Sequence, residues 1–533
     1  MQPFTFITAG TIVFRTGAAA DIDAIAGALL GPRVLVVTDD QLQKLGLCDP
    51  LVYGLQRSGT DVTVFDAVEA DPSESTVLAA RDMGRSAGVT GVVGLGGGSS
   101  LDVAKAAALL LGSGEQLSEA WGVNQARGPR LPLVLILTTA GTGSEVTPIA
   151  IITVGGDEKL AISSPILLPD VALLDPALTL GLPPKFTAAT GIDAMVHAIE
   201  AYTSASTNNN PISRSLAREA LRLLGAHVET AVKDGANPVA REAMLLGSML
   251  AGRAFANSPV AAVHALAYPL GGIFHIAHGF SNALVLIPVL RFNLPAAAPL
   301  YAEIAADIFP HLAIVPAELR AEALLTALTD LMARLGIPRQ LRDFGIGKSD
   351  LPQIAAEAMQ QTRLLVNNPM PITERDAFSI YSEAWYMRSL PSRRTDYAHF
   401  VPHTTRWNDN DVYGHLNNVV HYSLFDSTVG NWVVTRGLLD PLKSAVIALV
   451  AETGCRYFGE MHFPSVITAG LRIGKIGTSS VRYELGLFSG EQGVASAEGF
   501  FVHVYIDALS RKPCAIPEPT RLAMTELLSP SGA

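Results

Sequence analysis

Hydrophobic and polar positions change their period along the chain. Up to about residue 180, short apolar runs rich in β-branched residues alternate with helical stretches, for example 19–31 and 76–88. This alternation predicts a parallel sheet whose strands are joined by crossover helices. From about 185 to 387 the strand-like runs stop, and Ala- and Leu-rich helical periods predict an all-helical region, as in 211–232 and 316–336.

The pattern changes again near residue 388, where a polar, basic segment with one proline predicts a linker over 388–397. The other expected parts are an α/β domain over 1–183, an all-helical domain over 184–387 and a C-terminal domain over 398–533. A chain of 533 residues is long enough for two to four domains.

The C-terminal part opens with one strand that leads into a turn rich in Asp and Asn. A helix follows from about Asn417, and its inner face is expected to carry Val419, Val420, Leu424 and Phe425. Alternating runs then predict long antiparallel strands over 445–459, 465–489 and 493–509. Turns are expected at 474–477 and 490–493. One long helix wrapped by a bent antiparallel sheet is the hot-dog arrangement, an α+β fold.

Two glycine-rich turns follow strand-like runs in the N-terminal part. Residues 92–105 read VVGLGGGSSLDVAK, in which a helical pattern begins directly after the glycines. Backbone N–H groups in such a turn can approach a phosphate, and the helix dipole favours the anion. The turn is not the G-x-G-x-x-G fingerprint. Residues 131–147 end in a second turn whose small hydroxyl residues suit a close-packed ribose, diphosphate or nicotinamide.

A strand-like run over 33–40 reaches Asp39 at its end. An acidic residue at a strand end can hold ribose hydroxyls and repel a 2′-phosphate, which favours NAD over NADP. A plain helix N-cap explains Asp39 equally well from spacing alone. NAD is therefore the expected cofactor, with NADP as the alternative.

Four residues form a candidate metal site: Asp193, His197, His264 and His278. Asp193 and His197 are four apart in a helical run, so both side chains leave the same face. His264 and His278 lie in a later apolar stretch and could close the site. One carboxylate and three imidazoles suit Fe(II) or Zn(II) with an open position for substrate. Taken alone, Asp193 and His197 could be a surface pair or a buried polar pair. The second histidine-bearing segment in the same chain favours a metal site.

Composition narrows the class of protein. Apolar residues make up 49% and the net charge is −11, with the acidic excess before residue 388, which argues against nucleic acid as a partner. No uncharged apolar run reaches membrane-spanning length, and no signal peptide is expected. Three widely spaced cysteines suggest no disulfide framework, so a cytoplasmic location is expected.

The motifs at 96–105, 138–147, 191–202 and 264–284, in this order, resemble the iron-containing (group III) alcohol dehydrogenases over about residues 1–387. The resemblance implies an α/β dinucleotide-binding domain and an all-α metal-binding domain of the dehydroquinate synthase-like type. It places the metal ligands on Asp193, His197, His264 and His278. The cofactor-binding residues that it implies, together with Asp39, are Gly97, Gly98, Ser99, Asp102, Thr138, Thr139, Thr142, Ser144 and Lys159.

One position departs from this family. Many members carry a further histidine, often assigned a proton-relay role, four residues after the third ligand, and here that position is Tyr268. His275, three residues before His278, is the candidate catalytic substitute, with a structural role as the alternative.

The segment R-W-N-D-N-D-x-x-G-H-L-N-N resembles hot-dog acyl-CoA thioesterases of the 4-hydroxybenzoyl-CoA type, over roughly 398–525. The resemblance implies Asp411 as nucleophile or general base and backbone N–H groups near Gly414 as the oxyanion site. His415 matches a polar histidine of the related acyl-carrier-protein thioesterases, but Tyr413 stands where they carry asparagine. Turn chemistry without catalysis is the alternative for Asp409 and Asp411.

These observations predict a fusion of a metal- and NAD(P)-dependent alcohol dehydrogenase, or aldehyde reductase, with an acyl-CoA thioesterase. The expected substrates are an alcohol or aldehyde and an acyl-CoA. An inactive hot-dog module for dimerisation or acyl binding, or a hydroxyacid–oxoacid transhydrogenase body, is the alternative. Because hot-dog domains pair through their sheets, a homodimer or higher homo-oligomer is expected.

Overall fold

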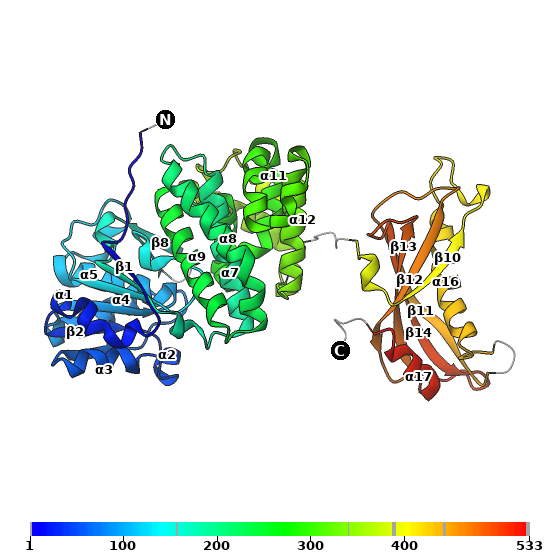
Figure 1. Ribbon diagram of the computed structural model, residues 1–533, viewed down its shortest axis with the longest axis horizontal. Helices are drawn as coiled ribbons and strands as arrows, with labels where there is room; N and C mark the ends of the chain where they lie inside the picture. Colours follow the sequence, from blue (N-terminus) through cyan, green and yellow to red (C-terminus); the bar gives the residue numbers. More distant parts are fainter. Residues whose placement is uncertain (1–2, 156–157, 339, 386–390, 441–443, 529–533) are drawn as a thin grey trace. The chain divides into compact units, whose positions relative to one another are not determined.

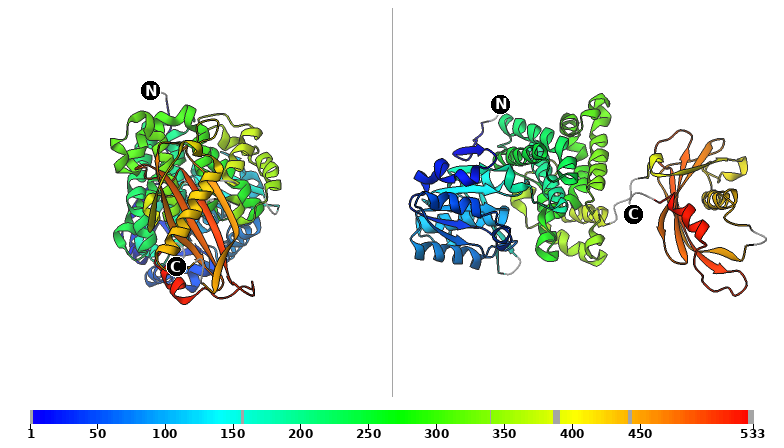
Figure 2. Two further views of the ribbon diagram at one scale, coloured as in Figure 1. Left: turned by 90° about the vertical axis from the view of Figure 1, so that its right-hand side faces the viewer. Right: turned by 60° about the horizontal axis from the view of Figure 1, so that its bottom comes forward.

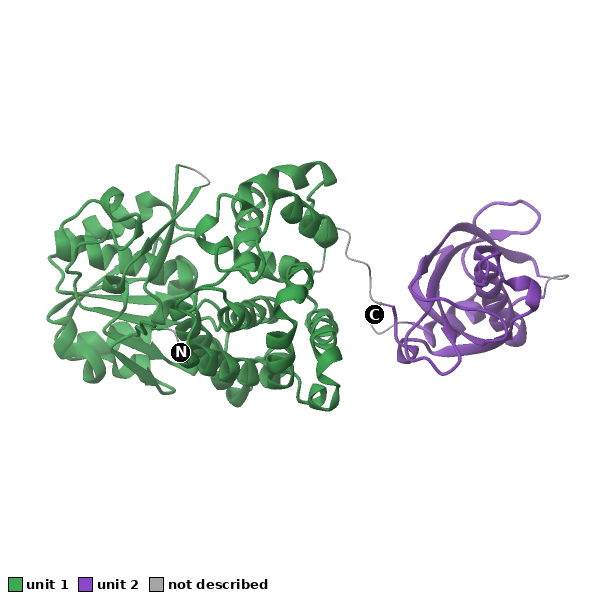
Figure 3. Cartoon of the chain, turned by 90° about the horizontal axis from the view of Figure 1, so that it is seen from above, with its two compact units in different colours: residues 1–387 green, residues 388–533 purple. Residues whose placement is uncertain are grey.

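A computed structural model describes residues 3–155, 158–338, 340–385, 391–440 and 444–528. The chain divides into two compact units, Met1–Met387 and Arg388–Ala533 (Figure 3). Each unit has its own hydrophobic core.

The first unit begins with an entirely parallel six-stranded sheet in the order β1-β9-β6-β4-β2-β3, of which Figure 1 labels β1 and β2. The strands are β1 (Thr11–Phe14), β2 (Arg33–Val37), β3 (Asp61–Phe65), β4 (Gly91–Gly96), β6 (Leu133–Leu137) and β9 (Val171–Leu174). Every residue of β4, β6 and β9 is buried. Continuous apolar runs form such strands because helices cover both faces of a parallel sheet.

Short and long helices connect these strands. They are α1 (Ala28–Leu30), α2 (Asp40–Lys44), α3 (Asp49–Arg57), α4 (Glu74–Ala87), α5 (Gly98–Ser113) and α6 (Leu117–Ala120). The sheet order runs outward from β2 to β3 and then in the opposite direction from β4, so the direction of winding reverses between β2 and β4. Ligands of open α/β sheets bind at the carboxyl ends of the strands at such a reversal.

A second, three-stranded sheet in the order β5-β8-β7 is formed by β5 (Gly122–Val123), β7 (Ile149–Val154) and β8 (Glu158–Ser163). β7 and β8 are antiparallel and form a hairpin. This hairpin follows the second glycine-rich turn and carries Lys159.

The described residues from 184 to 385 contain helices and no strand (Figures 1 and 2). Asn210 and Asn237 cap two of these helices by accepting hydrogen bonds from Ser213 N and Ala240 N. The α-helices are α7 (Pro184–Thr203), α8 (Pro211–Lys233), α9 (Pro238–Asn257), α10 (Ala262–Phe274), α11 (His278–Ile308), α12 (Ala317–Arg334), α13 (Leu351–Ala358), α14 (Thr362–Leu365) and α15 (Glu374–Trp385).

Helix α11 is, among the described residues, the one helix long and apolar enough to cross a membrane by length and composition. It contains three prolines and packs against α7, α8, α10, α12 and α15. Its side chains belong to the largest hydrophobic core of the unit. Burial inside the helical region therefore accounts for its apolar composition.

The second unit is a five-stranded antiparallel sheet in the order β10-β12-β13-β14-β11 with the long helix α16 packed on it (Figure 1). Its elements are β10 (His399–Thr404), α16 (Asn418–Thr435), β11 (Val446–Tyr457), β12 (Val466–Ile476), β13 (Ser480–Ser489), β14 (Ala497–Asp507) and α17 (Glu518–Thr525). The predicted fold class, α/β and all-α followed by an α+β hot-dog, is thus confirmed.

Two details of the second unit differ from the expectation. Val419 is exposed, whereas His421, Phe425, Thr428, Val429 and Trp432 are the buried residues of α16. Val419 lies about 200° around the helix from His421, which puts it on the opposite face. The turn expected at 474–477 is wrong in position, because β12 continues to Ile476 and a register shift, typical of a bulge, falls at Gly474.

Residues 388–390 of the expected linker lie outside the described residues. From Ser392 onward the chain is hydrogen-bonded to the second unit. Ala495 N donates to Ser392 O, and Arg394 N donates to Gly493 O. The segment before β10 is therefore held along the second unit's sheet.

Candidate metal and cofactor site

The first glycine-rich turn lies at the reversal point of the parallel sheet. Val37 of β2 pairs with Gly94 of β4 in parallel register, so the chain after both strands emerges at one edge. Gly97 is the N-cap of α5 and has no side-chain cap. A Cβ on Gly98 would lie 3.1 Å from the Thr142 side chain, so the two glycine-rich turns are close together. Bare backbone at a helix N-terminus is the expected geometry of a phosphate cradle.

Asp39 lies at this same edge as the N-cap of α2. Its Oδ1 accepts hydrogen bonds from Gln41 N and Leu42 N, each at 3.0 Å. Asp39 therefore does cap α2, as the alternative explanation of this residue expects. One carboxylate oxygen makes both capping bonds, so a ribose contact by the same residue stays a prediction.

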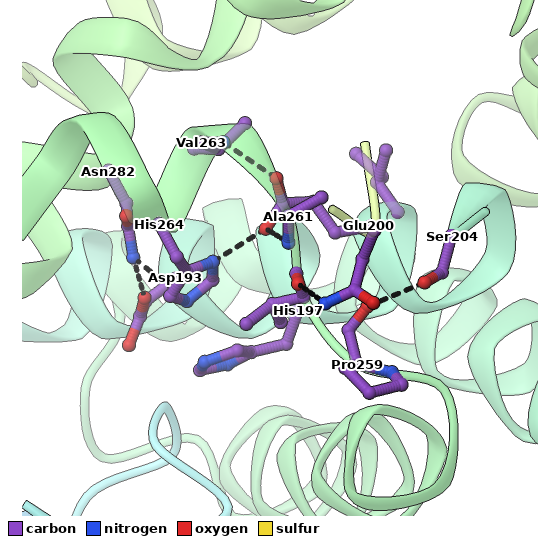
Figure 4. A network of polar contacts seen from close by, with 12 residues as sticks. Asp193, His197, Glu200, Ser204, Pro259, Ala261, Val263, His264 and Asn282 are labelled. Carbon is purple, nitrogen blue, oxygen red and sulfur yellow. Dashed lines mark hydrogen bonds and ion pairs between the residues drawn. The ribbon is translucent and has the colours of Figure 1, made fainter. Parts of the chain in front are cut away.

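The four candidate metal ligands come together in the helical region, and Figure 4 shows three of them, Asp193, His197 and His264. Asp193 and His197 lie on α7, His264 on α10 and His278 at the first position of α11. One ligand atom of each lies within 4.8 Å of the others. Asp193, His197 and His264 are buried, whereas the His278 side chain is 40% exposed, so the cluster is open on that side.

Hydrogen bonds fix the orientation of two imidazoles. His197 Nδ1 lies 3.2 Å from Gly141 O, and His264 Nδ1 lies 2.7 Å from Glu200 Oε2. Each contact leaves the other ring nitrogen, Nε2, for a ligand, as in carboxylate–histidine–metal triads. Glu200 is held in turn by Ala261 N at 3.0 Å and Val263 N at 2.7 Å (Figure 4).

Asn282 tests whether the cluster suits a cation. Its Nδ2 lies 2.6 Å from Asp193 Oδ1, 3.3 Å from His264 Nε2 and 3.2 Å from His278 Nε2. An amide has only two hydrogens for these three acceptors. Its own Oδ1 is buried without a hydrogen-bond partner among the described residues. Hydrogen-bond acceptors therefore outnumber hydrogen-bond donors in a buried space, which a cation would relieve. One carboxylate and three imidazoles are ligands that suit divalent iron or zinc.

The protonation states also suit ligation. Burial lowers the pKa of His197 to about 3, although Asp193 opposes the change. Partial loss of surrounding water also lowers the pKa of His278, although its side chain keeps an opening to solvent. Burial alone would raise the pKa of Asp193, but the neighbouring His197, His278 and His264 outweigh it and the net shift is downward. Two neutral imidazoles and an ionised carboxylate are the forms that bind metal.

A cavity of about 440 Å³ joins the cluster to the glycine-rich turns. Its walls include His197, His264 and His278 on one side. The predicted cofactor residues that line it are Gly98, Ser99, Asp102, Thr142, Ser144 and Lys159. The remaining ones, Asp39, Gly97, Thr138 and Thr139, do not line this cavity. A Cβ on Gly97 would nevertheless lie 3.6 Å from Thr139 Oγ1, so these two stay next to the turn.

Asp102 joins the two glycine-rich segments. Its Oδ1 accepts from Ser144 Oγ at 2.6 Å, and its Oδ2 accepts from Ile151 N at 2.9 Å. The fully buried Lys105 donates to Ser144 Oγ at 2.7 Å and to Ile149 O at 2.6 Å. Asp102 therefore positions the second turn, and Lys159 forms an ion pair with Asp71 at the cavity wall.

His275 lies outside the cluster. It is the left-handed C-cap of α10, is exposed, and does not line the cavity. Tyr268 does line the cavity, and its ring centroid is 6.2 Å from that of His278. His275, the suggested substitute, therefore lies away from the cluster, and Tyr268, which occupies the position of the missing histidine, lies beside it.

Sequence reasoning missed Glu200, Asn282 and Arg363. Glu200 is three residues after His197 and Asn282 four after His278, so helical spacing puts both beside predicted ligands. Arg363 lines the cavity from α14, far along the chain, and no local sequence pattern predicts that position.

The predicted catalytic turn of the second unit is a compact hydrogen-bonded loop. Asp411 Oδ1 accepts from Tyr413 N at 2.8 Å and His415 N at 3.0 Å. Gly414 N donates to Asp411 O at 3.1 Å, so the N–H groups around Gly414 are already engaged. The oxyanion site expected near Gly414 is therefore not preformed. His415 Nε2 lies 3.5 Å from Glu460 Oε2.

Comparison with known families agrees with this geometry. Residues 9–176 match the family described as iron-containing alcohol dehydrogenase, and residues 187–385 match its C-terminal region. Residues 405–524 match the thioesterase-like superfamily. The two matches in the first unit meet where the α/β region gives way to helices.

The first unit is also similar to individual proteins. It is 41% identical to long-chain-alcohol dehydrogenase 1 of Geobacillus thermodenitrificans over 356 residues, which are 66% of this chain and 89% of that protein. A crystal structure of 1,3-propanediol oxidoreductase has a TM-score of 0.69 and 34% identity, covering 72% of this chain and 100% of its own. Sulfoacetaldehyde reductase from Bifidobacterium kashiwanohense in complex with NAD+ has a TM-score of 0.66 and 31% identity, with coverages of 73% and 100%.

Proposed function

The chain belongs, through its first unit, to the iron-containing alcohol dehydrogenase family, and on this premise we propose that the unit is a metal- and NAD(P)-dependent alcohol dehydrogenase or aldehyde reductase. The observation that carries the proposal is one cavity lined both by the histidine cluster and by the glycine-rich turns. Such a cavity lets a substrate oxygen and a dinucleotide meet.

Asp193, His197, His264 and His278 would hold one divalent iron or zinc ion, which supplies Lewis-acid polarisation of a substrate oxygen and so eases loss of the alcohol proton. Glu200 keeps Nε2 of His264 turned toward the cluster. The bare backbone at Gly97 and Gly98 would bind the diphosphate, and Thr142 and Ser144 would flank the nicotinamide. The nicotinamide supplies or accepts the hydride.

The substrate class of the first unit is an alcohol or the corresponding aldehyde. The similar proteins are named for a long-chain alcohol, for 1,3-propanediol and for sulfoacetaldehyde. These names differ in length and charge, so the details of this chain's own cavity must decide between them.

We propose that the second unit is an acyl-CoA thioesterase in which Asp411 serves as nucleophile or general base. The match to the thioesterase-like superfamily and the position of Asp411 before the central helix support this. A binding or dimerisation module is the second candidate. It is favoured by one observation, namely that the Asp411 carboxylate and the nearby N–H groups satisfy one another.

The decisive experiment for the first unit measures metal content and alcohol oxidation together. We expect His264→Ala to lose nearly all bound metal and activity. Glu200→Gln should weaken metal binding by about 10- to 100-fold, because it removes the carboxylate that orients His264. His311→Ala, an exposed histidine outside the cavity, is the matched control. Stoichiometric metal in His264→Ala would show that the ion lies elsewhere.

A further inference from the structure

A buried carboxyl group without a hydrogen-bond partner lies in the second glycine-rich turn. Glu145 is part of the 3-10 turn Ser144–Val146, and its side chain is fully buried. Neither of its carboxylate oxygens has a hydrogen-bond partner among the described residues. Ionising such a group is costly, because a buried negative charge then lacks both water and hydrogen bonds. The carboxyl group therefore keeps its proton unless further positive charge comes close.

The turn that contains Glu145 forms one wall of the cavity at the metal cluster. Thr142 and Ser144 line this cavity, and Ser144 is next to Glu145 in the chain. Gly141 O, in the same turn, lies 3.2 Å from Nδ1 of the candidate ligand His197. Hydride transfer requires the nicotinamide and the substrate to meet beside the metal. On the proposed function, the nicotinamide ring therefore lies against the wall behind which Glu145 is buried.

The elements packed against this turn bring one cation to Glu145. Lys105 of α5 is fully buried, opposes the effect of burial on the Glu145 pKa, and donates to Ser144 Oγ at 2.7 Å. Asp102, 3.3 Å from Lys105 on the same helix, balances its charge. Arg253 of α9 follows a glycine that packs on the turn, but burial alone lowers its pKa, so no carboxylate acts on it. β6 and β9 add only apolar side chains. Among the described residues, ionised Glu145 would therefore add a negative charge that no cation balances.

The cofactor changes its charge next to this wall. The nicotinamide ring is a cation in NAD+ and is neutral in NADH. A nearby positive charge favours the ionised form of a carboxyl group, and the low dielectric of a buried site strengthens the interaction. Burial raises the pKa of Glu145 to about 7, so the oxidised ring acts on a group that is ready to ionise near neutral pH.

We propose that Glu145 discriminates between the oxidised and the reduced cofactor by releasing its proton when NAD+ binds and by taking up a proton when the ring becomes neutral. This rests on the proposed dehydrogenase function and adds a residue to it. Glu145 does not line the cavity, so it acts through its charge and not through contact with the substrate.

The protons of one turnover balance in this scheme. Binding of NAD+ transfers the Glu145 proton to solvent and leaves a carboxylate. Oxidation of an alcohol by NAD+ yields an aldehyde, NADH and one proton, and the Glu145 carboxylate takes up one proton at this stage. Glu145 stays protonated as NADH leaves. Each turnover therefore releases one proton overall, at the binding of NAD+.

The test measures proton release when a cofactor binds to the metal-loaded full chain without substrate. Calorimetric titrations at about pH 6.5, in two buffers with different ionisation enthalpies, give the number of protons exchanged. We expect NAD+ to release between about half a proton and one proton, and NADH to release none. Glu145→Gln keeps the shape of the side chain and should release none with either cofactor. Glu145→Asp keeps an ionisable group and should retain the release with NAD+.

The affinity for NAD+ should change with pH in the same way. Between pH 6 and pH 8 the Kd for NAD+ should fall by up to about tenfold in wild type, while the Kd for NADH changes little. Glu145→Gln should lose this difference between the two cofactors, which a purely structural role of Glu145 would leave in place. Glu374→Gln, an exposed glutamate on α15 outside the cavity, is the control and should behave as wild type.

Two results would overturn the inference. Proton release that persists in Glu145→Gln would place the titrating group elsewhere, for example on a metal-bound water, which also titrates near neutral pH. Binding of NAD+ to wild type without proton release would show that Glu145 does not respond to the ring. In both cases alcohol oxidation by wild type would leave the dehydrogenase function intact. A wild type that neither binds a cofactor nor oxidises an alcohol would overturn the dehydrogenase function and this inference together.

Discussion

A buried carboxylate lies directly behind the second glycine-rich turn. Glu145 is fully buried, and neither of its carboxylate oxygens has a hydrogen-bond partner among the described residues. Burial raises its pKa from 4.5 to about 7, although Lys105 opposes the shift. A carboxyl group in this setting is stable when protonated and costly when ionised.

This residue makes the first unit's stability depend on pH. A folded-state pKa above the unfolded value means that the contribution is fully present below about pH 4.5 and is lost as pH rises through about 7. A shift of this size corresponds to about 3 kcal/mol. We expect Glu145→Gln to remove this dependence. The stability of the variant relative to wild type should therefore increase as the pH rises from 5 to 8.

Hydrogen exchange of peptides from α5 and α9, corrected for intrinsic rates, would measure the effect in the first unit alone. Glu374→Gln, an exposed glutamate on α15, is the control and should keep the wild-type pH profile. The same pH profile in Glu145→Gln and wild type would mean that Glu145 stays ionised in the fold.

Asp39 allows capping and cofactor selection to be separated. Asp39→Asn keeps the Oδ1 acceptor for Gln41 N and Leu42 N but removes the charge. If the charge repels a 2′-phosphate, Asp39→Asn and Asp39→Gly should both raise the NADP/NAD ratio of kcat/KM, by about tenfold. The neighbouring Asp40→Asn should leave the ratio unchanged. A wild-type preference for NADP would mean that Asp39 only caps α2 and does not select the cofactor.

At the scale of helices and strands, local sequence patterns predict most elements of the first unit. Buried apolar runs predicted β2, β4 and β6, and the glycine-rich segments fall where strands end. The i,i+4 spacing of Asp193 and His197 put both on one face of α7, as the structure has it. These features depend on residues near one another in sequence, so their period is visible without the fold.

Other features depend on contacts between distant residues. The Glu200–His264 hydrogen bond spans 64 residues, and Arg363 reaches the cavity from another helix. In the second unit, the sequence around Gly474 predicts a turn, but glycine occurs equally at a β-bulge or where another chain segment approaches closely. A Cβ there would lie 2.6 Å from Glu484 Oε1 on the neighbouring strand, a constraint that appears only after the strands pair.

The turn before α16 decides whether the second unit is catalytic. Asp411→Asn keeps an oxygen for Tyr413 N and His415 N, so the loop should stay folded while the negative charge is lost. We expect it to abolish acyl-CoA hydrolysis and to leave alcohol oxidation unchanged. Free-thiol release from a panel of aliphatic and aromatic acyl-CoAs is the measurement.

Asp409→Asn is the matched control for Asp411→Asn. Asp409 Oδ2 accepts from Arg406 N at 2.6 Å, so this residue holds the 3-10 turn before the loop. It should affect stability more than rate. Equal hydrolysis by wild type and Asp411→Asn would place the catalytic group elsewhere, and no hydrolysis by wild type would favour a binding module.

At the scale of the whole molecule, the second unit leaves surfaces that a second copy could cover. β11 is at the edge of its sheet, is twelve residues long, and has partly exposed apolar residues such as Leu449 and Val450. The loop before α16 exposes Val412 by 93% and Tyr413 by 82%. A long open edge with apolar side chains favours pairing with another strand. We therefore expect the full chain to be at least a dimer through this unit.

Two variants test this assembly by light scattering. Val450→Lys puts a charge on the β11 edge and should shift the protein toward smaller species, whereas Val434→Lys, on α16 and equally exposed at 49%, should not. Removal of residues 388–533 should also reduce the assembly, and the remaining chain should keep its bound metal and alcohol oxidation, because the cluster and the cavity lie within residues 1–387. A monomeric wild-type chain would contradict pairing through β11. Unchanged assembly in the truncated protein would place the main interface in the first unit, and the exposed β11 edge would then be free to take part in some other contact.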